Sequence, residues 1–516
     1  MNALRLVLPS LLAWSVGAGA WLAAQSPASI QRAVNSITAE DVARRIGIIA
    51  HDSMRGRDTP SPELEETAQY IAAEFRRFGL KPGGDDGTFL QRYGVIHKAL
   101  DTAATVIALR GPQSARLKAG VDANVIRFGA LPDREIAGPI VMFSGPGDPA
   151  HPLAGADVKG AWVAQVLTAT PQGVQLDVPL AMAALEAGAA GILLVTNRPD
   201  AQWQNRMGRI TAPVVALEGR TAPEQAPAIV EIRDPTAARL LGIDPAAARA
   251  ATRREARRLE GYTLTFRPVE RVLSRVTAPN VVGVLEGSDP VLKREHLVYS
   301  AHMDHVGVAG SGGCGPVGAD SICNGADDDA SGTIAVVEAA EAFAQLDPRP
   351  KRSIIFLTVS GEEKGLWGSA HFAEHPPVPL ADLVANLNLD MVGRNWKDTI
   401  AVIGREHSDL GDWLERVAAA HPELDMHPIG DLWPQERFYF RSDHYNFARK
   451  GVPILFFFNG THPDYHRPTD EPEKIDAEKE ARIVKLVFHL GLEIANAPER
   501  PRWNPESYRR IVESAN

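Results

Sequence analysis

Short apolar runs that end in polar residues recur through the second half of the chain. These runs are rich in β-branched and aromatic side chains and comprise residues 297–300, 353–359, 384–389 and 452–458. Such runs predict strands that are buried on both faces of a sheet. A pattern with helical spacing, for example over residues 333–346, lies between them. This alternation predicts an α/β sandwich with a mixed, mainly parallel central sheet.

The first half of the chain has a different pattern. A helix is predicted over residues 61–78, with a serine as N-cap and a proline in its first turn. Over residues 117–232, short β-like runs alternate with Pro and Gly, and an Ala-rich helix at 180–188 leads into an apolar strand at 189–195. We therefore expect a separate, β-rich domain in this region. The Ala- and Arg-rich residues 245–260 predict a helical connector.

Length and charge narrow the class of protein. A chain of 516 residues is long enough for two or three compact units. Its net charge of −10 argues against a nucleic-acid-binding protein, which usually carries a basic surplus. We expect no nucleic-acid partner.

The beginning of the chain predicts export. Arg5 precedes an apolar run over residues 6–24 that ends in small residues, as in a signal peptide. The alternative is an uncleaved membrane anchor, because the run is close to the length that spans a bilayer. We favour cleavage, which would leave a periplasmic or extracellular protein without a stable membrane span.

Polar residues that can bind metal follow the apolar runs. The carboxyl ends of strands are where open α/β sheets carry their sites. The candidate ligands in chain order are His, Asp, Glu, Asp and His, and such nitrogen and oxygen donors suit a pair of zinc ions. The five segments that contain them are residues 301–304, 325–332, 360–365, 388–391 and 465–470.

These segments, taken in order, resemble the co-catalytic two-zinc aminopeptidases, a family that includes secreted bacterial leucyl aminopeptidases and, more distantly, glutamate carboxypeptidases. The resemblance covers residues 280–476 and the earlier segment 54–57. It implies a three-layer α/β/α sandwich of the zinc exopeptidase type and two Zn²⁺ ions per chain. One ion would be held by His302, Asp328 and Asp390, and the other by Asp328, Glu363 and His466.

The resemblance also implies roles for neighbouring residues. Glu362 would act as the general base, and Tyr465 would stabilise the oxyanion. Asp304 would orient the imidazole of His302. The Asp-Ala-Ser-Gly ending places the bridging ligand at Asp328, with Asp327 and Asp329 as the alternatives. The Arg-Pro-Thr-Asp turn favours His466 over its rival His462 as the last ligand, and His305 is expected around the centre or on the surface.

Two further groups of residues are candidates. Arg441, Asp443 and His444 resemble a segment that borders the substrate pocket in this family. Cys314 and Cys323 lie close together in a Gly-rich loop, and in an oxidising compartment they can form a disulfide. Free thiols or metal ligands are the alternatives, and we favour the disulfide because the ligand set is complete without sulfur.

The expected organisation follows from these features. The inserted domain resembles the protease-associated domain, whose helix, Ala-Gly-Ala-Ala-Gly turn and apolar strand match residues 180–195. We expect a signal peptide at 1–24, an N-terminal part of the peptidase domain at 38–115, the inserted domain at 116–240, a connector at 241–275, the catalytic domain at 276–498 and a C-terminal tail at 499–516.

The expected activity is peptide hydrolysis, with removal of N-terminal residues from peptide substrates. A carboxypeptidase or dipeptidase of the same fold is an alternative. A glutaminyl cyclase uses one zinc ion, and the presence of His302 and both aspartate ligands argues against it. A non-catalytic relative would not need the ligands, none of which is missing here. The sequence leaves the oligomeric state open.

Overall fold

The computed structural model describes residues 25–127, 130–170, 173–220, 226–310 and 313–515. The predicted signal peptide at 1–24 lies outside these residues. The chain divides into two compact units, of which one contains Gly94–Thr277 and the other contains the residues on either side. We call them the inserted unit and the sandwich unit. The chain passes between the two along β2 (Leu90–Leu100) and β14 (Glu270–Leu285).

The sandwich unit is built on the predicted mixed sheet. Its strands follow the order β14-β16-β15-β17-β20-β18-β19. Neighbours are parallel from β16 to β20, whereas β14 and β18 pair antiparallel with β16 and β20. The bounds confirm the four strands predicted from the apolar runs: β15 (His296–His302), β16 (Ser353–Val359), β17 (Leu383–Leu389) and β20 (Ile454–Phe457). Two further strands, β18 (Thr399–Ile403) and β19 (His427–Ile429), were not predicted. The short β1 (Lys81–Pro82) pairs with β14.

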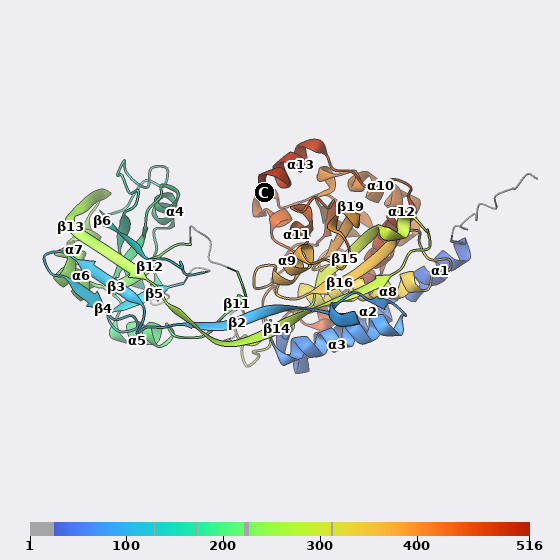
Figure 1. The fold of residues 1–516 in the computed structure, drawn as a ribbon, viewed down its shortest axis with the longest axis horizontal. Helices are drawn as coiled ribbons and strands as arrows, with labels where there is room; N and C mark the ends of the chain where they lie inside the picture. Colours follow the sequence, from blue (N-terminus) through green and yellow to red (C-terminus); the bar gives the residue numbers. More distant parts are fainter. Residues whose placement is uncertain (1–24, 128–129, 171–172, 221–225, 311–312, 516) are drawn as a thin grey trace, which may run out of the picture. The chain divides into compact units, whose positions relative to one another are not determined.

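Helices cover both faces of this sheet, which gives three layers (Figure 1). Alternate residues of one strand point to opposite faces, so Tyr299 of β15 joins one core and Val298 joins the other. The helices of the first face are α1 (Pro27–Ser36), α2 (Ala39–Ile49), α3 (Pro62–Arg77), α8 (Gly332–Ala344), α10 (Leu410–Ala420) and α12 (Ala477–Asn496). Those of the second face are α9 (Trp367–Glu374), α11 (His444–Ala448) and α13 (Pro505–Ile511).

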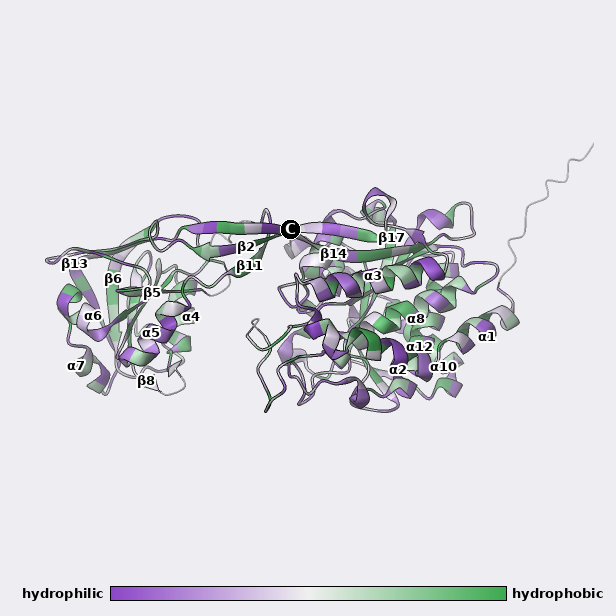
Figure 2. Ribbon diagram, turned by 90° about the horizontal axis from the view of Figure 1, so that it is seen from below, coloured by the Kyte–Doolittle hydropathy of each residue, from purple (hydrophilic) through white to green (hydrophobic). Residues whose placement is uncertain are grey.

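Hydropathy explains how these helices are placed. In Figure 2, α8 is largely green, whereas α3 carries both purple and green positions. Nearly all residues of α8 are buried, as expected of a helix at the centre of its layer. The predicted start of α3 is confirmed, because the Ser61 side chain accepts a hydrogen bond from the Leu64 amide. The apolar side chains of Ile71 and Phe75 in this helix are fully buried.

The inserted unit is rich in strands, as predicted. Its main sheet has the order β4-β3-β13-β6-β7-β10-β12-β5. The strands are β3 (Val106–Arg110), β4 (Ala115–Leu117), β5 (Ala123–Ile126), β6 (Ile136–Ser144), β7 (Trp162–Leu167), β8 (Ala169–Thr170), β9 (Gly173–Val174), β10 (Gly191–Thr196), β11 (Val214–Leu217), β12 (Ile229–Arg233) and β13 (Glu255–Arg267). The helices are α4 (Val178–Glu186), α5 (Asp200–Gly208), α6 (Asp234–Leu241) and α7 (Pro245–Ala250).

The predicted connector helix is wrong over most of its length. Only α7, at Pro245–Ala250, is helical, and β13 begins at Glu255 and pairs with β6 and β3. Ala- and Arg-rich composition favours a helix locally, but the paired strands on both sides and the burial of Leu264 and Phe266 decide otherwise. Residues 499–516, expected to form a tail, include α13, where Ile511 is buried.

Candidate metal centre

The candidate ligands come from one edge of the parallel part of the sheet. His302 is the last residue of β15, Asp390 directly follows β17, and Glu362 and Glu363 follow β16. Because these three strands are parallel neighbours, their carboxyl ends lie at the same edge. The loop that precedes α8 brings Asp328 to the same place.

The first group of ligands is fully packed inside the protein. The Nε2 atom of His302 lies 3.4 Å from Oδ1 of Asp328 and 3.7 Å from Oδ1 of Asp390. All three side chains are buried, and their donor atoms are close enough to share one metal ion. The Ser442 hydroxyl donates a hydrogen bond of 2.8 Å to the other carboxylate oxygen of Asp390, which holds that side chain in place.

The second group shares Asp328 with the first. The Nε2 atom of His466 lies 3.1 Å from Oδ2 of Asp328 and 3.2 Å from Oε1 of Glu363. The two oxygens of Asp328 therefore face different histidines, His302 on one side and His466 on the other. This is the arrangement that a bridging carboxylate between two metal ions requires.

The two aspartates beside Asp328 have other partners. Asp329 accepts hydrogen bonds from the backbone amides of His302, Gly332 and Met391 at 2.8–3.1 Å. Oδ1 of Asp327 accepts a hydrogen bond from the Gly393 amide, and its other oxygen lies 3.2 Å from Nε2 of His462. Both carboxylates hold the loop around the centre. His462, the rival for the last ligand, thus faces Asp327, whereas His466 faces Asp328 and Glu363.

Asp304 contacts His302 on the side of the imidazole that faces away from Asp328 and Asp390. Its backbone carbonyl lies 3.1 Å from Nδ1 of His302, and its carboxylate lies 3.7 Å from the same atom. The carboxylate also accepts hydrogen bonds from the Thr59 hydroxyl and the Glu362 amide, at 2.8 and 3.3 Å. Nδ1 thus faces oxygens of Asp304, which leaves Nε2 of His302 directed at Asp328 and Asp390.

The charges of this group fit metal ions. Within the described part of the chain, Oδ2 of Asp328, Oε1 of Glu363 and Nε2 of His466 are buried and make no hydrogen bond. Burial opposes a charged imidazole, but Asp328 and Glu363 raise the pKa of His466 to about 10. Burial likewise opposes ionisation of Asp328, yet the neighbouring histidines hold its pKa well below the usual range. Imidazole nitrogens and carboxylate oxygens thus converge here, and the negative charge of the carboxylates favours a bound cation. Such a set of donors suits zinc.

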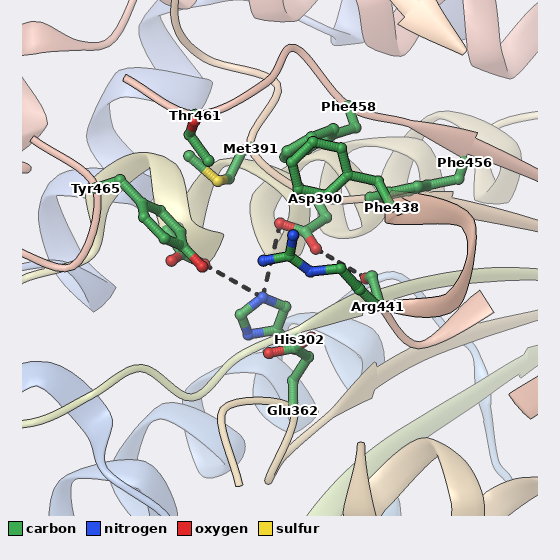
Figure 3. A pocket seen from close by; sticks show the side chains of 12 residues that line it. His302, Glu362, Asp390, Met391, Phe438, Arg441, Phe456, Phe458, Thr461 and Tyr465 are labelled. Atoms are coloured by element: carbon green, nitrogen blue, oxygen red, sulfur yellow. Dashed lines mark hydrogen bonds and ion pairs between the residues drawn. The ribbon is translucent and has the colours of Figure 1, made fainter. Parts of the chain in front are cut away.

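Glu362 lines a pocket beside this group (Figure 3). Burial, together with the nearby carboxylates of Glu363, Asp443 and Asp390, raises the pKa of Glu362 well above its usual value. A raised carboxyl pKa is what a group needs to accept and then return a proton near neutral pH. The Tyr465 side chain lines the same pocket, and burial raises the pKa of its hydroxyl, which therefore stays a neutral donor.

The three residues predicted to bind substrate take different positions. Arg441 lines the pocket, with its guanidinium 4.7 Å from the ring centre of Phe438. Asp443 is fully buried, and burial raises the pKa of its carboxyl to about 7. The structure does not bring His444 to the pocket wall, because its ring is fully buried and stacks on Phe456 at 4.2 Å.

Two residues that organise the centre were not predicted. Arg57 is fully buried and donates hydrogen bonds to the carbonyls of Ile49, Met303, Asn324 and Gly325, so it fixes the segments that carry His302 and Asp328. It lies in the segment 54–57 that belongs to the family resemblance, which was the available signal. Asp470 accepts hydrogen bonds from the amides of Asp327 and Asp328 at 3.0 and 3.2 Å.

The loop before Asp328 is covalently closed. Cys314 and Cys323 form a disulfide with their Cα atoms 5.9 Å apart. Both cysteines are buried with Val306 in a small apolar cluster. The bridge therefore braces the loop from which the chain continues into Gly325 and the ligand segment.

Comparisons with known proteins agree with this geometry. Residues 280–491 match the model of peptidase family M28. The chain is 29% identical over 373 residues to a probable zinc metalloprotease of Pyricularia oryzae, covering 60% of this chain and 70% of that protein. It is 26% identical to aminopeptidase YwaD of Bacillus subtilis, covering 45% of this chain and 48% of that one. The chain thus spans about half the length of the second relative.

Solved structures extend the likeness in fold. The aminopeptidase from Aneurinibacillus sp. strain AM-1 superposes with a TM-score of 0.52 at 19% identity, covering 91% of this chain and 97% of that one. BSAP, a zinc aminopeptidase from Bacillus subtilis, superposes with a TM-score of 0.50 at 18% identity. The first of these structures covers 91% of this chain, which is more than either compact unit contains. The likeness in fold therefore extends over both units.

The fold and the ligand cluster at its sheet edge define a zinc metallopeptidase. The region that matches the model of peptidase family M28, residues 280–491, lies within the sandwich unit.

Proposed function

We propose that this chain is an aminopeptidase with two zinc ions. His302, Asp328 and Asp390 would hold one ion, and Asp328, Glu363 and His466 the other. The observation that carries the proposal is the position of Asp328, whose two oxygens face Nε2 of His302 at 3.4 Å and Nε2 of His466 at 3.1 Å. A carboxylate shared in this way is the mark of a two-metal site.

The side chains around the ions would carry the proton transfers. When bound, the zinc ions supply polarisation of the scissile carbonyl and a water molecule that is easier to deprotonate. Glu362 would take the proton from that water and pass it to the leaving amine. The Tyr465 hydroxyl would donate a hydrogen bond to the oxygen that becomes negative. Ser442 and Asp304 would keep Asp390 and His302 oriented while this happens.

The pocket favours a free amino terminus next to an apolar side chain. Asp390 and Glu362 offer acceptors for an ammonium group on the wall that carries the ligands. Phe438, Phe456 and Phe458 lie together on another part of the wall (Figure 3). An apolar first side chain placed against these rings would leave the amino group among the carboxylates, which supports exopeptidase cleavage at the N-terminus.

The test compares leucine para-nitroanilide with its acetylated form. Acetylation removes the charge and leaves buried acceptors unpaired, at a cost of about 1–3 kcal/mol, so each 1.4 kcal/mol lost lowers the rate about tenfold. We expect the acetylated compound to be cleaved about 5- to 150-fold more slowly. Equal rates for the two compounds would rule out recognition of the amino terminus.

A second candidate is a carboxypeptidase or dipeptidase, which Arg441 favours. Its guanidinium lies on the pocket wall, and among the described residues it forms one ion pair, at 3.4 Å, with the exposed Glu436. A substrate carboxylate could replace this partner and bind the fork of the guanidinium. Faster cleavage of an acetylated dipeptide with a free carboxyl end than of leucine para-nitroanilide would favour this candidate.

Two further proposals concern the rest of the chain. We propose export through the predicted signal peptide, which would make the disulfide of Cys314 and Cys323 stable outside the cytoplasm. Among the helices of the described residues, none has the length and apolar character to cross a membrane. We also propose that the inserted unit, Gly94–Thr277, is a domain of the protease-associated type, based on its helix and apolar strand at α4 and β10.

A further inference from the structure

His305 lies beside the second group of ligands and could hold a metal ion together with Asp328 and Glu363. Its side chain is fully buried, and its Nδ1 atom is 2.9 Å from Oε1 of Glu363 and 3.7 Å from Oδ2 of Asp328. Its ring stands edge to face with that of His466, with the ring centres 5.5 Å apart. The donor atoms of His305, Asp328 and Glu363 all lie within 4.8 Å of one another. The sequence analysis placed this histidine around the centre or on the surface and not among the ligands.

The surrounding chain is shaped to admit this ring. Gly325 has φ +58°, and a Cβ atom there would lie 2.5 Å from Cγ of His305. A side chain at position 325 would therefore push the imidazole out of the cluster. The backbone amide of His305 donates to the carbonyl of Arg57, which fixes its position in the loop.

Packing alone does not account for the ring. Among the described residues, neither ring nitrogen of His305 has a hydrogen-bond partner, and an unsatisfied buried polar group costs about 1–3 kcal/mol. Although Nδ1 and the Glu363 oxygen are close, the direction of approach is not that of a hydrogen bond. Two ligands of the same metal ion lie close together without a hydrogen bond in this way, because both donor atoms point at the ion and not at each other.

We propose that Nδ1 of His305 is a fourth protein ligand to the ion shared by Asp328, Glu363 and His466. The proposal rests on the two-zinc centre proposed above. It makes the two positions unequal, since the position at His302 has three protein ligands. Four protein donors complete the usual coordination of zinc, whereas three leave a place for water or substrate. The position at His305 fills first and binds zinc more tightly, and the position at His302 keeps the open place.

The number of imidazoles around zinc tests this assignment directly. The purified full-length chain is stripped of metal, reloaded with one zinc ion per chain and measured by X-ray absorption spectroscopy. Without His305 as a ligand, each position has one imidazole, so any distribution of the ion gives one per zinc. With His305, the value rises toward two. We expect a value close to two in the wild-type chain and one in His305→Ala.

Zinc affinity gives a second readout that does not depend on turnover. Competition with a chromophoric chelator should show two affinities in the wild-type chain, with the tighter one weakened about tenfold or more in His305→Ala. His305→Gln keeps a polar side chain of similar reach and guards against a folding defect in the alanine variant. His407→Gln is the control, because His407 is a buried imidazole that contacts the Ser507 hydroxyl away from the ligands.

The outcomes separate the two proposals. One imidazole per zinc in the wild-type chain, or unchanged tight binding in both His305 variants, would overturn the role of His305. If two zinc ions were still bound and peptides cleaved, the aminopeptidase proposal would stand. Binding of fewer than two zinc ions by the wild-type chain at saturation would instead overturn the two-zinc centre on which both depend.

Discussion

Replacing each of the two adjacent glutamates by glutamine separates proton transfer from metal binding. Glu362 lines the pocket and is not within the groups of atoms that converge as ligands, whereas Glu363 is. The change to glutamine preserves size and removes one carboxylate oxygen with its charge. Because the two residues follow the same strand, β16, any general effect of the change on this loop should be similar for both.

The structure gives a different expectation for each. Loss of a positioned general base lowers the rate by about 10²–10⁴, which corresponds to about 3–5 kcal/mol in the barrier. Glu362→Gln should therefore keep its zinc and lose turnover by this factor. Oε1 of Glu363 lies 2.9 Å from Nδ1 of His305 and 3.2 Å from Nε2 of His466. Its loss removes a charged partner worth about 1.5–3 kcal/mol, so Glu363→Gln should bind one zinc ion about 10- to 100-fold more weakly.

The assay pairs kcat with zinc content on the same preparations. Both variants are dialysed against a weak chelator, their zinc is measured by atomic emission, and turnover of leucine para-nitroanilide is then followed with and without added zinc. Glu66→Gln, an exposed position on α3, controls for handling. Near-normal turnover in Glu362→Gln would refute its role as the base, and full zinc retention in Glu363→Gln would refute its role as a ligand.

Three more predictions follow from the same structure. Saturated protein should contain two zinc ions per chain by elemental analysis, and a chelator should abolish activity until zinc is restored; full activity with one ion or none contradicts this. Mass spectrometry of exported protein should find Cys314 and Cys323 joined, and two free thiols would count against the bridge. His444, whose burial lowers its pKa to about 3, stays neutral in the fold while the unfolded chain takes up a proton below about pH 6.5. The protein therefore loses stability as pH falls. Between pH 7 and pH 5, the difference in unfolding free energy between the wild-type chain and His444→Asn should shrink by about 2 kcal/mol. A constant difference would show that His444 does not titrate in this way.

Much of the sandwich unit could be predicted from local pattern. Buried parallel strands consist of continuous apolar runs, so β15, β16, β17 and β20 are visible without knowledge of their partners. The polar residues that follow these strands are also visible in the sequence, because each group stands directly after an apolar run. The inserted unit was recognisable as rich in strands, but the end of α7 and the start of β13 were not, because pairing with β6 and β3 overrides the helical preference of an Ala- and Arg-rich segment.

The sequence by itself determined the types of residue at the centre and the strands that deliver them. It left three aspartates and several histidines as competing candidates, because neighbours along a loop can point in any direction. The tertiary structure gives these candidates different neighbours. Asp329 accepts hydrogen bonds from backbone amides, and Asp327 accepts them from the Gly393 amide and the Ser331 hydroxyl. Asp328 alone among the three faces both His302 and His466. The position of His305 beside Glu363 depends on the same folding of distant segments, in which the Arg57 carbonyl and Gly325 place a ring that no local pattern identifies.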